Sequence, residues 1–148
     1  MWIRGHAARR GWSDKVEPEE VLALVRERMR VGGATFAVAV DTDRIVGIGH
    51  ALPARERDGE GALMSGVLHL SMVAVQPDRW GEGVGKAIVR YFLAQAKLRG
   101  FETIQLWTHL TNQRAQRLYA GIGFREAGRE KIDDRGETIR LYTMRLHN

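Results

Sequence analysis

The chain contains no cysteine among its 148 residues. This absence excludes disulfide bonds, thiolate nucleophiles and zinc sites built on cysteine, and it leaves the redox compartment undecided. No apolar run approaches the length of about 20 residues that spans a bilayer, so we expect no membrane partner. The chain does not open with a basic stretch followed by an apolar block, as a secretory signal does, so the cytoplasm is the expected location.

The charge is basic without being concentrated in one stretch. The formal net charge is +5 at pH 7, but acidic and basic residues alternate at 55–58 and 129–131, as on a solvated surface. A basic balance suits a polyanionic ligand, whereas nucleic-acid binding needs a clustered basic stripe and stacking aromatic residues. We therefore expect no nucleic-acid partner. The length predicts a single domain over residues 1–148.

The most informative segment joins an apolar run to a periodic run through three glycines. Residues 68–75 predict a buried strand, and residues from about 83 to 99 predict a helix. Between the two lie Gly81, Gly83 and Gly85. Glycine lets the backbone approach a ligand closely, and the first N–H groups of a helix have no partner within it. The segment therefore predicts a site for a phosphate or pyrophosphate.

The glycines alone are a weak signal. Their spacing differs from the dinucleotide-binding fingerprint, which has a later third glycine and an acidic residue about 20 positions on. No Gly-Lys-Ser or Gly-Lys-Thr follows, as a P-loop requires. Taken by themselves, the glycines fit an ordinary strand–helix connection equally well.

Hydrophobic patterns predict the other elements. A proline followed by two glutamates opens a helix at 18–29, and a short strand at 2–4 precedes it. A second short helix follows Asn112, a good N-cap residue. The segment 53–66 predicts a polar loop that is long for a compact domain and therefore a candidate functional segment. Further strands are predicted at 35–40, 44–52, 103–109, 124–131 and 138–146.

The strand at 68–75, the following helix and the strand at 103–109 form a βαβ crossover. Such a unit makes its two strands parallel neighbours with a right-handed connection. Hairpins on either side are antiparallel. The prediction is a single α/β domain with a mixed, mostly antiparallel sheet of six to seven strands, helices on both faces and a central parallel βαβ unit. An exposed strand at the edge of the sheet would also allow two copies to form a homodimer.

This order of elements, with two motifs, resembles the GNAT N-acetyltransferase superfamily from about residue 35 to residue 146. The family's glycine turn has the pattern Gln/Arg-x-x-Gly-x-Gly/Ala. Its counterpart here is Trp80-Gly81-Glu82-Gly83-Val84-Gly85, in which Trp80 replaces Gln or Arg and Arg79 stands beside it as a substitute. Residues 112–124 match the second motif, Asn-x-x-Ala-x-x-Leu-Tyr-x-x-x-Gly-Phe.

The resemblance implies acetyl-coenzyme A as co-substrate, no metal, and an amine of a small molecule or peptide as acceptor. It implies that the strand ending at Val75 holds the pantetheine arm and supplies an oxyanion N–H. The turn would hold the pyrophosphate, Asn112 would help to position the cofactor, and Tyr119 would protonate the sulfur. The implied cofactor-binding residues are Val73, Ala74, Val75, Arg79, Trp80, Gly81, Glu82, Gly83, Val84, Gly85, Lys86, Asn112 and Tyr119.

The proton acceptor is less defined. A lysine-like amine has a pKa near ~10.4 and must lose a proton before it attacks. Family members often carry a Glu on the strand before the glycine turn, but residues 68–72 contain no carboxylate. His69 lies about where that Glu can lie and is the candidate base. His109, His50 and a water molecule are the alternatives.

Two functions follow from the resemblance. The first is transfer of an acetyl group from acetyl-coenzyme A to an amine. The second is a non-catalytic sensor that binds an acyl-coenzyme A on the same fold, because fold does not determine function. A tyrosine at 119 and a titratable group near the thioester favour the enzyme. The patterns do not identify the amine or the length of the acyl group.

Overall fold

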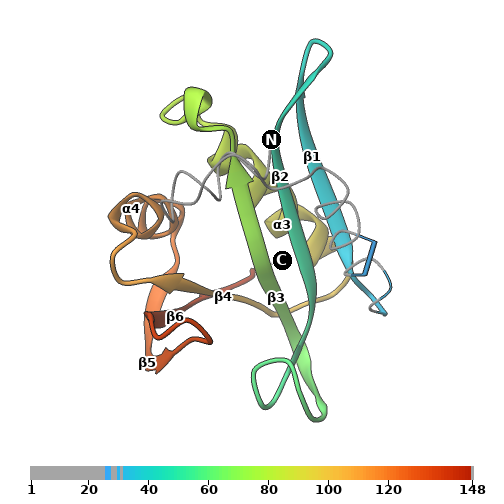
Figure 1. The fold of residues 1–148 in the computed structure, drawn as a ribbon. Coiled ribbons are helices and arrows are strands. Elements are labelled where there is room, and N and C mark those ends of the chain that lie inside the picture. Colours follow the sequence, from blue (N-terminus) through green and yellow to red (C-terminus); the bar gives the residue numbers. More distant parts are fainter. Residues whose placement is uncertain (1–25, 28–29, 31, 148) are drawn as a thin grey trace.

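The computed structural model describes residues 26–27, 30 and 32–147. Six strands form one mixed sheet in the order β1-β2-β3-β4-β6-β5, and the β3–β4 pair is parallel. Figure 1 shows this arrangement. The elements are β1 (Thr35–Asp41), β2 (Arg44–Arg55), β3 (Leu63–Val75), the 3₁₀ turn η1 (Pro77–Arg79), α3 (Val84–Leu98), β4 (Thr103–His109), α4 (Gln113–Ile122), β5 (Arg125–Ile132) and β6 (Thr138–Arg145).

The predicted α/β class with a central βαβ unit is confirmed. The predicted strand at 2–4 lies outside the described residues. The predicted helix at 18–29 also lies outside them, apart from Arg26 and Glu27, which are helical. None of the helices that the structure describes is long and apolar enough to cross a membrane.

Half of the predicted loop at 53–66 is strand. β2 continues to Arg55 and β3 begins at Leu63, so only a short hairpin tip connects them. Pro53 is paired with Leu68 next to an irregularity in the register. A proline costs a sheet only one N–H donor, and such an irregularity tolerates that loss. The local pattern of proline and polar residues therefore indicated a loop where strand pairing extends.

Helix α3 packs on one face of the sheet and forms the centre of the core. Ile88 and Phe92 are 3% and 0% exposed, and they lie directly over two glycines of β2. A Cβ built on Gly49 would lie 2.5 Å from Phe92 Cε2, and one on Gly47 would lie 2.8 Å from Ile88 Cδ1. Glycine at these two positions lets the helix approach the sheet closely.

The β3–β4 ladder is short compared with the two strands that form it. Pairing runs only from Val67 opposite Thr103 to His69 opposite Gln105. Beyond this point β3 continues to Val75 along β2, while β4 continues to His109 along β6. The two strands diverge (Figure 1). We refer to the divergence that begins at His69 and Gln105 as the fork.

Candidate active site at the β3–β4 fork

The fork, the glycine turn after β3 and the first turns of α4 lie next to one another. Gly85 in the first turn of α3 is within reach of α4, since a Cβ there would lie 3.3 Å from Leu118 Cδ2. The Arg114 guanidinium of α4 lies 4.7 Å from the centre of the Trp80 ring on the turn. Figure 1 shows α4 and the turn at the same end of β3. Both motifs found in the sequence therefore meet at one place.

Gly81 and Gly83 give the turn its shape. Their φ angles are 83° and 85°, in the left-handed region that other residues rarely adopt. A Cβ on either would meet nothing within 4 Å, so the surface beside the turn is open. Gly83 is the N-cap of α3 and provides no side-chain cap. The first turn of α3 contains no acidic residue, and its N–H groups suit an anion.

Gly85 has a different role from the first two glycines. It lies within α3, and its position is set by packing against Leu118 and Val75, 3.3 and 3.6 Å from a built Cβ. The glycine therefore brings α3, α4 and the end of β3 together.

The basic residue on the turn is already engaged. Arg79 forms ion pairs with Asp41 and, at 3.6 Å, with Glu82. Arg44 adds a second link from β2, with Nη2 2.6 Å from Gln76 Oε1 and 3.0 Å from Asp78 Oδ2. These contacts attach the turn to the β1–β2 hairpin. As a phosphate ligand, Arg79 would have to release acidic partners.

Trp80 attaches the turn to β3. Its indole N–H donates to the carbonyl oxygen of Val75 at 3.0 Å, and its side chain is 36% exposed. The residue that departs from the family pattern therefore has a structural contact of its own.

His69 is half-buried at the fork. Gln105 Nε2 lies 3.4 Å from His69 Nδ1. Burial lowers the pKa of His69 to about 4; Lys131 contributes to the lowering, and the Asp58 carboxylate opposes it. The imidazole is therefore neutral at pH 7, which is the form that can accept a proton.

The other two candidate histidines are held by structural contacts. His50 is 2% exposed, hydrogen-bonded through Nδ1 to the Ser71 hydroxyl and packed against the Phe36 ring at 4.6 Å. His109 Nε2 lies 2.9 Å from Asp133 Oδ2 and 3.0 Å from Glu137 Oε2. Of the three histidines, His69 is the one in the last residue pair of the β3–β4 ladder, where the fork begins.

The group of His109, Asp133 and Glu137 links the end of β4 to the β5–β6 turn. A backbone N–H bond from Glu137 and the bond to the His109 ring help to lower the pKa of Asp133 to about 2. The ligand atoms of the three residues lie within 4.8 Å of one another, so this is the place among the described residues where a metal could be held. The imidazole already bridges the two carboxylates.

Asn112 and Tyr119 both have structural contacts. Asn112 Oδ1 accepts the backbone N–H of Ala115 at 3.1 Å, which makes it the predicted N-cap of α4. Tyr119 is 8% exposed, and its ring packs edge-on against Phe124 at 5.7 Å. Their roles toward a cofactor stay predictions.

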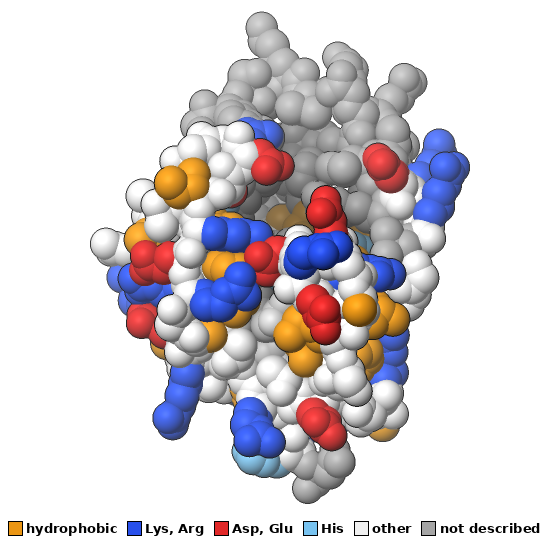
Figure 2. Space-filling view, turned by 90° about the horizontal axis from the view of Figure 1, so that it is seen from below, with side chains coloured by type: hydrophobic (Ala, Val, Ile, Leu, Met, Phe, Trp, Pro, Cys, Tyr) orange, Lys and Arg blue, Asp and Glu red, His pale blue; other side chains and the backbone are white. Residues whose placement is uncertain are grey.

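Sequence patterns gave no sign of a charged cluster beside His69. Asp58 of the β2–β3 hairpin tip pairs with Arg129 at 3.2 Å and with Lys131 at 3.5 Å. Both cations lie over the Trp107 ring, at 5.4 and 4.6 Å. The cluster joins the hairpin tip to residues of β5 that lie about 70 positions later in the sequence. Acidic and basic side chains are interspersed on the coloured part of the face seen in Figure 2.

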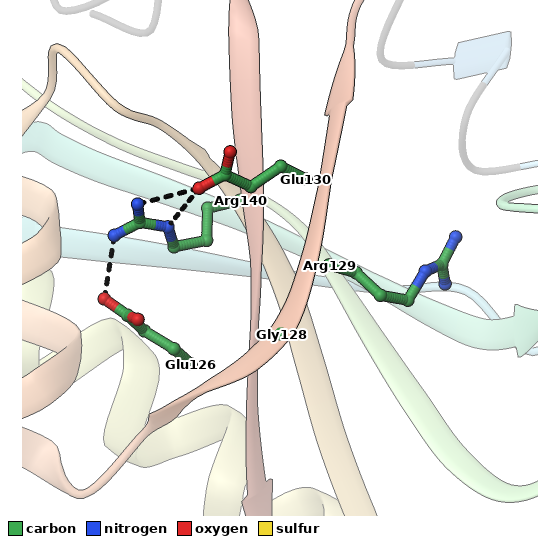
Figure 3. A pocket seen from close by; sticks show the side chains of 5 residues that line it. All are labelled: Glu126, Gly128, Arg129, Glu130 and Arg140. Carbon is green, nitrogen blue, oxygen red and sulfur yellow. Dashed lines mark hydrogen bonds and ion pairs between the residues drawn. The ribbon is translucent and has the colours of Figure 1, made fainter.

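A polar pocket lies on β5 and β6, at the edge of the sheet. Figure 3 shows Glu126 and Glu130 directed at the Arg140 guanidinium, while Arg129 points away from them. The ion pairs measure 2.7 and 2.8 Å. Because these charges already satisfy one another, the pocket offers little to a charged ligand.

Residues 3–124 match the acetyltransferase (GNAT) family. Two curated mouse (Mus musculus) proteins are similar to the chain. N-acetyltransferase 8F1 is 30% identical over 124 residues, which are 82% of this chain and 54% of that protein. N-acetyltransferase family 8 member 7 is 33% identical over 123 residues, 83% of this chain and 49% of that protein. The chain thus spans about half the length of the curated relatives it matches.

Solved structures share the fold at low sequence identity. The ribosomal-protein-S18-alanine N-acetyltransferase from Escherichia coli aligns with a TM-score of 0.68 and 18% identity over 93% of this chain and 79% of that one. An aminoglycoside 6'-N-acetyltransferase complexed with coenzyme A aligns with a TM-score of 0.69 and 17% identity over 99% of this chain and 90% of that one. Together with the family match, the fork and the glycine turn lead to one conclusion: the chain belongs to the GNAT acetyltransferase family.

Proposed function

We propose that this protein is an acetyl-coenzyme A-dependent N-acetyltransferase that moves an acetyl group to a primary amine. The fork is the observation that carries the proposal. The β3–β4 ladder stops at His69 and Gln105, and an extended pantetheine arm can add along a diverging strand as a peptide adds to a sheet edge. The open glycine turn next to it suits the pyrophosphate. The coenzyme A complex of the structurally similar aminoglycoside acetyltransferase supports this reading.

In the proposed reaction the neutral amine attacks the thioester carbon directly. A C–N bond forms, the carbonyl oxygen becomes an oxyanion, and a backbone N–H of residues 73–75 donates to it. The C–S bond then breaks, and the Tyr119 hydroxyl gives its proton to the departing thiolate. Holding both reactants in the fork supplies the proximity that the reaction needs.

His69 is the proposed proton acceptor. A pKa of about 4 makes it too weak a base to deprotonate a free ammonium ion with a pKa near ~10.4. It suits two later tasks: accepting a hydrogen bond from an amine that is already neutral, and taking the proton from the tetrahedral adduct. Water is the alternative acceptor.

A non-catalytic acyl-coenzyme A sensor is the second candidate, because the same fold can bind the cofactor without catalysing a transfer. A panel of primary amines separates the two functions. Free thiol release from acetyl-coenzyme A is measured together with its dissociation constant by calorimetry. Turnover with any amine supports the enzyme, saturable binding without turnover supports the sensor, and no binding contradicts both. A cytoplasmic location and a homodimer stay part of the proposal, to be tested by cell fractionation and light scattering.

A further inference from the structure

The glycine turn has a balanced charge of its own and a second cation beside it. Arg79 is paired with Asp41 and Glu82, so the basic residue of the turn and its acidic neighbour offset each other. Arg114 approaches from the first turn of α4, with Cζ 4.7 Å from the centre of the Trp80 ring. Among the described residues no carboxylate pairs with Arg114, and its side chain is exposed.

Trp80 is well fixed as a platform for this cation. Its backbone N–H donates to Pro77 at 3.3 Å, and its indole N–H donates to the Val75 carbonyl at 3.0 Å. Both ends of the residue are therefore held, one by η1 and one by β3. A guanidinium stacked on an exposed indole gains a modest cation–π attraction. The stacking keeps Arg114 beside the open surface at Gly81 and Gly83 without neutralising its charge.

The local field favours an anion at this point. A cation in the first turn of a helix is opposed by the helix dipole, and the first turn of α4 contains no acidic residue to offset Arg114. The first turn of α3 also contains none. A phosphate group lying between Arg114 and the turn would relieve this unfavourable arrangement, and a guanidinium binds phosphate with two parallel hydrogen bonds.

We infer that Arg114, held on the Trp80 ring, binds a phosphate group of the acyl-coenzyme A cofactor and replaces the Gln or Arg that the family pattern has at position 80. This inference rests on the proposed function. The phosphate belongs either to the pyrophosphate or to the 3′-phosphate of the nucleotide, and both offer the same dianionic oxygen chemistry.

Calorimetric titration with acetyl-coenzyme A and with its 3′-dephospho form tests the inference. Arg114→Ala is expected to weaken acetyl-coenzyme A binding by roughly 10- to 100-fold, the range for a charged hydrogen bond. Arg117→Ala is the matched control, because it removes the same charge one turn further along the same exposed helix face, and it is expected to change binding by less than about twofold. If Arg114→Ala weakens binding of the 3′-dephospho form as much as binding of acetyl-coenzyme A, the contact is with the pyrophosphate. If Arg114→Ala does not weaken binding of the 3′-dephospho form, the contact is with the 3′-phosphate.

Trp80 variants test the platform. Trp80→Ala is expected to weaken binding about as much as Arg114→Ala, and the double variant is expected to be no weaker than either, because coupled residues are non-additive. Trp80→Phe keeps a ring face and is expected to retain most of the affinity. Wild-type affinity in Arg114→Ala would overturn the inference while leaving the proposed function intact. A wild-type protein that binds no acetyl-coenzyme A would instead contradict the proposed function.

Discussion

Gln105 and His69 face each other across the last paired step of β3 and β4, with 3.4 Å between the amide nitrogen and Nδ1. The amide nitrogen can only donate, so the neutral ring carries its proton on Nε2, and Nδ1, the nitrogen that can take a proton, is the one that Gln105 contacts. The strands diverge from this step onward. The pair therefore defines both the narrow end of the fork and the orientation of the imidazole.

His69→Ala is expected to lower turnover and to remove an acid-side inflection from the pH–rate profile. A free imidazole titrates near ~6.5, but burial moves this inflection to about pH 4, the pKa of His69 in the folded protein. The measurement is kcat against pH with a saturating amine. His109→Ala serves as the comparison, and an unchanged profile in His69→Ala would assign the proton to another group or to water.

His69 also predicts a pH dependence of stability. Its folded pKa, about 4, is lower than the ~6.5 expected for the unfolded chain. Between these two pKa values the unfolded state therefore binds more protons than the folded state. The contribution of His69 to the free energy of unfolding is lost as pH falls from about 6.5 to about 4. Urea unfolding of wild type and His69→Gln over this range measures the difference. A difference that does not change with pH would contradict the prediction.

Gly83→Asp is expected to abolish the rise in melting temperature that acetyl-coenzyme A produces by binding the folded state. The variant places a side chain and a negative charge beside the N–H groups of the turn. Gly136→Asp is a matched control, since Gly136 has a similar φ of 79° and equally open surroundings in the β5–β6 turn. Both variants lose stability through strain at positive φ. If Gly83→Asp still responds to the cofactor as wild type does, the pyrophosphate lies elsewhere.

Tyr119→Phe is expected to lower turnover by about 10²-fold, the scale of general acid catalysis, while the dissociation constant of acetyl-coenzyme A stays the same. The hydroxyl acts on the departing thiolate and not on the bound ground state. Tyr91→Phe, which removes a hydroxyl from an exposed tyrosine of α3, is the control. Near-normal turnover in Tyr119→Phe, with chemistry limiting, would leave Tyr119 as a core residue whose replacement by Ala costs only stability.

Gly49→Ala is expected to reduce the free energy of unfolding by about 1–3 kcal/mol, as overpacking does. The added methyl would lie 2.5 Å from Phe92 Cε2 in the core. Gly121→Ala is the control, because a Cβ there meets nothing within 4 Å and alanine favours the helix by about 1 kcal/mol. Chemical denaturation of both variants should therefore give changes of opposite sign.

The predicted features that the structure bears out depend on neighbours in the chain. The Asn112 N-cap follows from the capping preference of a single residue type. The parallel β3–β4 pair follows from the order strand, helix, strand. Periodicity and capping are local, so the sequence alone was enough to predict the class of fold, while the anion site at the glycine turn stays a prediction.

Contacts between distant residues were decided only by the tertiary structure. The local pattern of residues 53–66 indicated a loop, but cross-strand pairing made both ends of the segment strand. Arg79 stood next to the turn in the sequence, yet Asp41 from 38 positions away engages its charge. Arg114 reaches Trp80 and Gln105 reaches His69 in the same way, across 34 and 36 positions. Such contacts produce no periodic pattern in the sequence, because their energy depends on where the sheet and helices bring the side chains together.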